Sequence, residues 1–137
     1  MSEKYSKGLL VLTAFFSLIV GISGCHQGPA TARVTGRVTF DGKPLPSALV
    51  EFFPEDGSRS SVGSTNAEGF YELKFSATAI GAIPGRHQVV IRTVTGESDS
   101  ENKVTRKEIL PDKYHKKSEL TVELKSGKQV VNFDLTP

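Results

Sequence analysis

The sequence predicts an all-β fold, a β-sandwich of about seven short strands. Apolar and polar residues alternate in short runs along residues 34–135, and turns rich in Gly, Pro, Asn and Asp separate these runs at spacings near a dozen residues. After the first 25 residues no segment shows the period of an amphipathic helix. The chain has one cysteine, so its stability must come from burial and backbone pairing rather than from an intramolecular disulfide.

The first expected strand covers residues 34–40, where every second residue is apolar or glycine. Asp41 and Gly42 follow it, and both residue types tolerate the positive φ angles of a tight hairpin turn. Pro44 and Pro46 cannot donate a backbone hydrogen bond, so they belong at a sheet edge or at the beginning of a strand.

The same alternation predicts the remaining strands at residues 48–53, 62–65, 70–75, 87–95, 120–124 and 131–135. The strand at 87–95 is apolar on both sides near its middle, which favours a central strand covered on both faces. A turn at 126–128 is expected to pair the last two strands as a hairpin. Five residues in the apolar phase of their strands are expected to share one core: Phe52, Leu73, Ile91, Val122 and Phe133.

The first 25 residues have the order of an export signal. Lys4 and Lys7 precede an apolar run at 9–22, and small residues then lead to Cys25. The run is shorter than the roughly 20 residues that a membrane-spanning helix needs. The segment is therefore expected to be removed, although a retained amino-terminal anchor or an unmodified thiol remain alternatives.

The four residues Ile22-Ser23-Gly24-Cys25 resemble the lipobox of bacterial lipoproteins. The resemblance implies a signal peptide over residues 1–24, cleaved before an acylated Cys25 that holds the protein on a membrane outside the cytoplasm. Residues 25–32 have nothing to bury and are expected to be a tether. Residues 33–137 then form a single domain.

Several segments of that domain resemble the carboxypeptidase regulatory-like, or transthyretin-like, β-sandwich. The segments are Val34-Thr35-Gly36-Arg37-Val38-Thr39-Phe40-Asp41-Gly42-Lys43-Pro44-Leu45 and Thr65 to Tyr71. Two others are similar to a subgroup of small bacterial lipoproteins with one such domain: Gly81 to His87 and Leu110 to Tyr114. The resemblance implies a transthyretin-like or immunoglobulin-like sandwich and carries little information on activity.

Catalysis is not expected. Transthyretin-like folds include 5-hydroxyisourate hydrolases, but the amino-terminal histidine motif and the carboxy-terminal Tyr-Arg-Gly-Ser of those enzymes have no counterpart here. The prediction is therefore a non-catalytic binding or structural module, and the alternative is a small hydrolase on this fold. A pocket that gathers His87, Arg86 or Arg92 and an acidic side chain would favour the hydrolase.

No metal site and no cofactor are expected. His26, His87 and His115 are far apart in the sequence and fall in a tether, a strand and a charged loop. The acidic residues in the turns lack the close spacing of a calcium loop: Asp41, Glu55, Asp56, Asp99 and Glu101.

The long connection at 95–118 is locally basic, and Lys113, Lys116 and Lys117 are its candidate contacts to an anionic surface. A solvated, mobile connection, with Leu110 and Tyr114 holding it to the sandwich, is the favoured interpretation. The whole chain has 17 Lys and Arg against 15 Asp and Glu, which gives no reason to expect nucleic acid as a partner. The expected partner is the membrane, through the lipid, and an envelope protein or polysaccharide is a further candidate.

Overall fold

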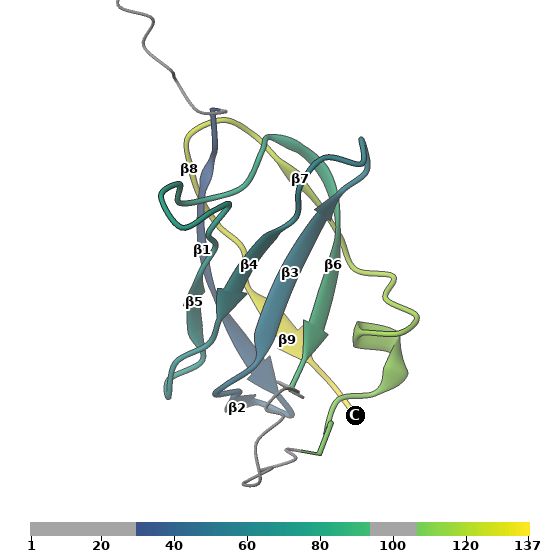
Figure 1. Ribbon diagram of the computed structural model, residues 1–137. Coiled ribbons are helices and arrows are strands. Elements are labelled where there is room, and N and C mark those ends of the chain that lie inside the picture. Colours follow the sequence, from purple (N-terminus) through teal and green to yellow (C-terminus); the bar gives the residue numbers. More distant parts are fainter. Residues whose placement is uncertain (1–29, 94–106) are drawn as a thin grey trace, which may run out of the picture.

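The computed structural model describes residues 30–93 and 107–137, which form two β-sheets packed face to face (Figure 1). The elements in chain order are β1 (Arg33–Phe40), β2 (Lys43–Pro44), β3 (Leu49–Pro54), β4 (Ser61–Ser64), β5 (Phe70–Glu72), β6 (Gly85–Arg92), the 3₁₀ helix η1 (Asp112–Tyr114), β7 (Thr121–Leu124), β8 (Lys128–Val130) and β9 (Phe133–Leu135). The predicted all-β sandwich is confirmed. The described part has nine strands rather than about seven, because a short β2 forms and the last strand is divided into β8 and β9.

The first sheet is built around β1. Along its first half β1 pairs with β5 antiparallel and with β8 parallel, and along its second half it pairs with β2 antiparallel and with β9 parallel. The hairpin between β1 and β2 turns at Asp41 and Gly42, whose φ angles are 51° and 73°. The predicted turn is thus confirmed, and two successive positive φ angles match the twist that a two-residue hairpin requires.

The second sheet has the order β4-β3-β6-β7, and all its pairs are antiparallel. The expected hairpin between the last two strands is wrong. After β7 the turn at 125–127 carries the chain to the other sheet, where β8 and β9 run parallel to β1. This crossing brings Phe133 and Leu135 onto the inner face of the first sheet, where both are buried.

Strand β6 is internal in its sheet, as predicted, but only one of its faces is fully covered. His87, Val89 and Ile91 are buried, whereas Arg86 and Gln88 on the other face are exposed. The expected burial of both faces is therefore wrong, because a two-layer sandwich packs only the inner face of each sheet.

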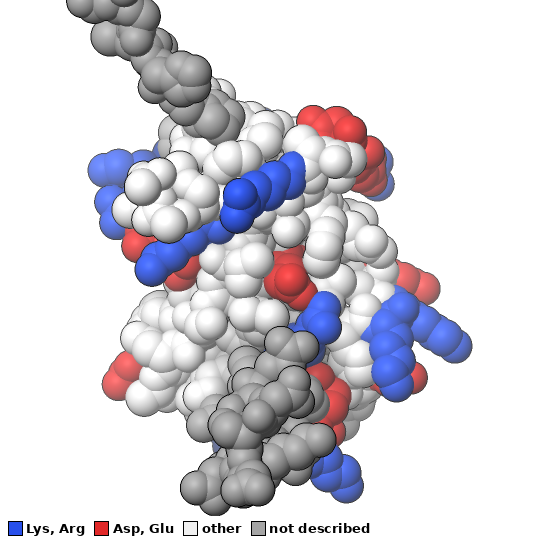
Figure 2. Space-filling model, viewed as in Figure 1, with Lys and Arg blue, Asp and Glu red and all other residues white. Residues whose placement is uncertain are grey.

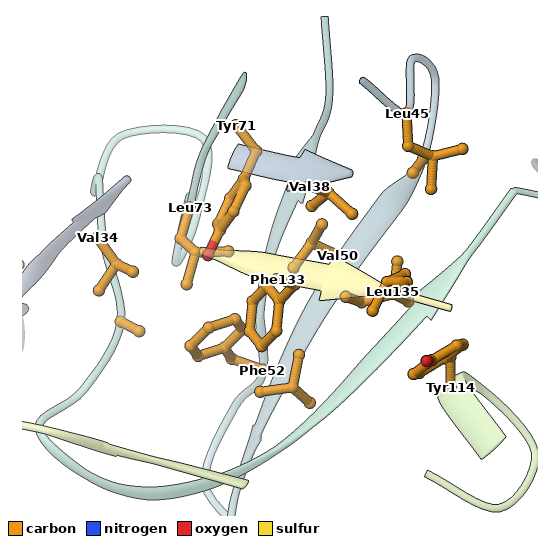
Figure 3. Packing of buried hydrophobic residues seen from close by; sticks show 14 of the residues in the cluster. Val34, Val38, Leu45, Val50, Phe52, Tyr71, Leu73, Tyr114, Phe133 and Leu135 are labelled. Carbon is orange, nitrogen blue, oxygen red and sulfur yellow. The ribbon is translucent and has the colours of Figure 1, made fainter. Parts of the chain in front are cut away.

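Four of the five predicted core residues are buried between the sheets: Phe52, Leu73, Ile91 and Phe133. Figure 3 shows Phe52, Leu73 and Phe133 within this core. The Phe133 ring lies 6.2 Å from that of Phe52 and 6.4 Å from that of Tyr71. The fifth residue, Val122, packs against this core but is only partly buried. Its strand, β7, is at the edge of the sheet, so fewer neighbours cover it.

The sandwich begins earlier than the predicted boundary at residue 33. Ala32 is fully buried and exchanges two backbone hydrogen bonds with Ala82, and the Thr31 hydroxyl donates to the Ile80 carbonyl oxygen. These residues had been assigned to the tether, which therefore ends before Thr31. Residues 1–29, with the predicted signal peptide, Cys25 and most of the tether, lie outside the described residues. Within the described ranges no helix is long and apolar enough to cross a membrane.

Candidate binding groove

A groove lies on the outer face of the first sheet. The odd-numbered residues of β1 point away from the core, so Thr35 faces outward between Glu72 of β5 and Val130 of β8, its partners in the two ladders. Two residues further along β1, Arg37 is paired with Phe70. This register places polar and apolar side chains side by side across the middle of the sheet.

The groove has a volume of about 510 Å³. Its lining combines outward side chains of β1 and β5 with residues from neighbouring loops and strands: Arg33, Thr35, Gly36, Ser64, Asn66, Phe70, Tyr71, Glu72, Val130 and Asn132. A second hollow of about 280 Å³ shares Arg33, Thr35 and Val130 with the first and adds Lys128 and Gln129. The short side chain of Thr35 therefore borders both hollows.

The polar groups of the groove are held in place by hydrogen bonds and an ion pair within the fold. The Arg33 Nε atom lies 2.7 Å from Glu72 Oε1, which forms an ion pair. The Asn132 Oδ1 atom accepts a hydrogen bond from the Arg37 backbone N–H at 2.9 Å, and the Asn66 Oδ1 atom accepts from the Phe70 N–H at 2.9 Å. Each amide side chain is thereby oriented before any ligand arrives.

Two apolar side chains of the groove are exposed to solvent. Phe70 is 52% exposed and Val130 is 72% exposed. The Arg37 guanidinium carbon lies 5.3 Å from the centre of the Phe70 ring, and its Nε atom donates to the Glu68 carbonyl oxygen. Because Arg37 restricts the ring, Phe70 offers a defined apolar surface beside hydrogen-bonding groups, which is the mixture found in ligand sites.

The arrangement that would favour a hydrolase is not found. His87 is fully buried, its Nε2 atom lies 2.7 Å from the Ile83 carbonyl oxygen, and its ring packs against Phe52 at 5.8 Å. The two arginines near it in the sequence lie on the outer face of β6. Arg86 is ion-paired with Glu55 and Arg92 with Glu51.

Of the two other histidines, only His115 is among the described residues. His115 contacts the Leu110 carbonyl oxygen at 3.0 Å, and His26 lies outside the described residues. Among the residues that the structure describes, no group of three or more His, Cys, Asp or Glu side chains could hold a metal ion.

Residues 107–118 pack onto the sandwich, so the expectation of a fully solvated connection is wrong for this part of the loop. Leu110 and Tyr114 are buried, which confirms their predicted anchoring role. The Glu108 carboxylate accepts hydrogen bonds from the Thr93 hydroxyl at 2.6 Å and from the Leu110 N–H at 3.0 Å. The first part of the predicted loop, up to residue 106, lies outside the described residues.

The three candidate lysines have different surroundings. The Lys113 Nζ atom lies 3.2 Å from the Pro137 carbonyl oxygen and near the Tyr114 ring, and Lys116 is 3.6 Å from Asp112. Lys117 is exposed. Figure 2 shows basic side chains gathered at the side of the molecule where η1 lies in Figure 1, with acidic ones close by. Lys113 and Lys116 thus have partners within the fold, and acidic side chains lie beside the basic ones on this side.

A small electrostatic effect is expected from these lysines. Changing Lys113, Lys116 and Lys117 together to Gln in a chain that starts at residue 26 should weaken binding to anionic vesicles at low salt. The difference should shrink at physiological salt as the Debye length shortens. Co-sedimentation with liposomes measures both values. Equal binding of the two proteins at low salt would remove any role for the lysines at an anionic surface.

The sequence alone does not reveal the groove residues, because the outward-facing side chains of β1 and β5 are expected simply to face solvent. The signal that could have found them is the short Thr35 between longer outward residues, together with Phe70 in a polar phase. Neither observation identifies a groove until the pairing of β5 and β8 with β1 is known.

No protein-family model matches the chain, and no curated protein matches it either. Among solved structures, the chain is similar to a DUF3823 family protein from Parabacteroides merdae, with 17% sequence identity and a TM-score of 0.43. The match covers 80% of this chain and 48% of that protein, so the chain spans about half the length of its structural neighbour.

Proposed function

We propose that this protein is a lipid-anchored component of the cell envelope whose β-sandwich is a non-catalytic binding module. The observation that carries the proposal is the groove on the outer face of the first sheet, where oriented polar groups border the exposed Phe70 and Val130. Such concave sites with a few fixed polar groups are typical of ligand binding. The domain is proposed to be of the carboxypeptidase regulatory-like type, on the sequence resemblance and the two-sheet architecture.

A binding role is favoured over hydrolysis by the position of His87. A general base must reach a substrate, but this side chain is fully buried in the core. The purified protein should therefore leave 5-hydroxyisourate intact. If the wild-type protein hydrolyses that compound and the His87→Gln variant does not, the proposed binding module is contradicted and the hydrolase is supported.

The proposed anchor predicts a covalent fatty acid on Cys25. Cells supplied with a clickable palmitate analogue should label the wild-type protein and the Ser17→Ala control, whose change leaves the four lipobox-like residues intact. Cys25→Ala should abolish the label, because no other thiol is present in the chain. Label of equal intensity on Cys25→Ala would contradict the proposal.

The binding role can be tested in intact envelopes with a photo-reactive amino acid. Placed at Val130, in the groove, it should form adducts on irradiation. Placed at Thr121, an exposed position of β7 in the other sheet, it should form none. Absence of adducts at Val130, or equal adducts at both positions, would contradict a binding role for the groove.

A further inference from the structure

We propose that the groove binds a neutral polysaccharide chain, laid across β1 between Phe70 and Val130. This inference rests on the proposed binding function and names the class of ligand. It depends on three properties of the lining: its charge, the kind of hydrogen-bonding groups that it offers, and the continuity of the two hollows.

The charge of the lining disfavours an anionic ligand. In the larger hollow the charged residues are Arg33 and Glu72, and they neutralise each other at 2.7 Å. The remaining lining residues are uncharged. Two further positive charges lie beside this pair: Lys128 in the smaller hollow, and Arg37, which is stacked on Phe70 and bonded to the Glu68 carbonyl oxygen. A phosphate-rich or uronic-acid polymer would have to compete with Glu72 for Arg33, whereas a neutral ligand leaves the ion pair in place.

The hydrogen-bonding groups match hydroxyl groups. Strand β1 is paired on both sides, so its own backbone is occupied by the ladders and offers no edge for a peptide to extend. Recognition across β1 therefore uses side chains. The groove provides a guanidinium, a carboxylate, two amides and three hydroxyls, of which that of Tyr71 is already bonded to the Val131 carbonyl oxygen. A sugar hydroxyl donates and accepts at once, so it can satisfy donors and acceptors lying next to each other.

The apolar side chains complete this match. A sugar ring presents C–H groups on its faces and hydroxyls around its rim. Phe70 and Val130 are exposed on the strands on either side of β1, opposite Arg37 and Thr35. Covering them would remove apolar surface from water while the rim reaches the polar groups. A purely apolar ligand would instead cover the Arg33–Glu72 pair and the two amides without offering them any hydrogen bond.

The extent of the groove indicates a chain rather than a single sugar. The two hollows share Arg33, Thr35 and Val130, so the depression continues across β1 from the β5 side to the β8 side. A linear oligosaccharide can occupy both hollows at once. Because its units are covalently linked, binding of one unit in the first hollow favours binding of the next in the second.

Native gel electrophoresis through immobilised polysaccharides tests the inference. The full chain is extracted in a polyoxyethylene detergent, because the sugar headgroup of a glucoside detergent would compete for the groove. The gels contain one of four neutral polymers (laminarin, glucomannan, galactan or starch), or an acidic one (polygalacturonate or alginate). We expect at least one neutral polymer to retard the wild-type protein and the acidic polymers to leave it unretarded.

Matched variants locate the site. Thr35→Tyr should fill the groove and abolish the retardation, whereas Thr121→Tyr, the same change on the other sheet, should leave it intact. Both positions face outward on strands that favour aromatic residues. Phe70→Ala, at a half-exposed position, should raise the dissociation constant at least tenfold. A melting curve on each variant checks that it is folded. If Thr35→Tyr does not fold, Phe70→Ala still tests the site.

Three results would overturn the inference. One is retardation by the acidic polymers alone, and another is equal retardation of the wild type and both groove variants. The third is no retardation by any neutral polymer. In that last case the photo-adduct at Val130 separates two failures. An adduct that a protease digests would mean that the groove is a binding site for a protein partner. No adduct would contradict the proposed binding function as well.

Discussion

Replacing Phe133 with alanine is expected to lower the free energy of unfolding by about 3–5 kcal/mol. The ring lies between the sheets, where it meets Phe52 edge-on and stacks with Tyr71 (Figure 3). The change therefore removes apolar contacts to both sheets and leaves a cavity that only partial relaxation can fill. Chemical denaturation monitored by circular dichroism measures the loss, which is a large part of the stability of a domain of this size.

The matched control is Phe53→Ala. Phe53 is the neighbour of Phe52 on β3, but it faces outward and is 37% exposed. Its truncation should cost less than about half of the Phe133 change, because water already covers part of the ring. Equal losses for the two variants would mean that Phe133 does not join the sheets as described.

Replacing Gly36 with alanine is expected to cost about 3 kcal/mol or more, or to prevent folding. A Cβ atom added at this position would lie 1.7 Å from the Val131 carbonyl oxygen and 2.8 Å from the Tyr71 ring. The nearest atom belongs to the backbone, so no side-chain rotation can relieve the overlap. Strand β1 and the segment between β8 and β9 would have to separate, which would break the hydrogen bond from the Val131 N–H to the Thr35 carbonyl oxygen.

Gly57→Ala serves as the comparison. Gly57 has a φ of 76°, and a Cβ atom added there meets nothing within 4 Å. This substitution should cost only about 1 kcal/mol, the penalty for placing a side chain in the left-handed region. If both alanine variants melt at similar temperatures, the close approach of β1 to Val131 is not a feature of the folded protein.

The packing around Val131 also shapes the groove. The Tyr71 hydroxyl donates to the Val131 carbonyl oxygen at 2.7 Å, and burial raises the pKa of Tyr71, so the hydroxyl keeps its proton. This contact lies where the ladder along β1 passes from β8 to β9, and there the Asn132 side chain accepts the hydrogen bond of the Arg37 N–H. The core contact thus fixes the wall formed by Val130 and Asn132.

Features that depend on neighbouring residues could be predicted from the sequence. Alternation with a period of two located the strands and their buried phase, since successive side chains of a strand point to opposite faces. Asp41 and Gly42 identified the first hairpin, because few other residue pairs accept two positive φ angles. The same reasoning placed Leu110 and Tyr114 as anchors, because they are apolar residues in a charged segment.

Features that depend on which strands meet were decided by the tertiary structure. The alternation of residues 128–135 is compatible with a hairpin on β7. Pairing beside β1 buries Phe133 and Leu135 equally well, and it leaves β1 paired on both edges. The groove exists only because this pairing sets Val130 opposite Thr35. What the sequence by itself determined is therefore the all-β sandwich, its strands and most of its core. The position of β8 and β9, the docking of residues 107–118 and the groove required the tertiary structure, because each is formed by residues far apart in the chain.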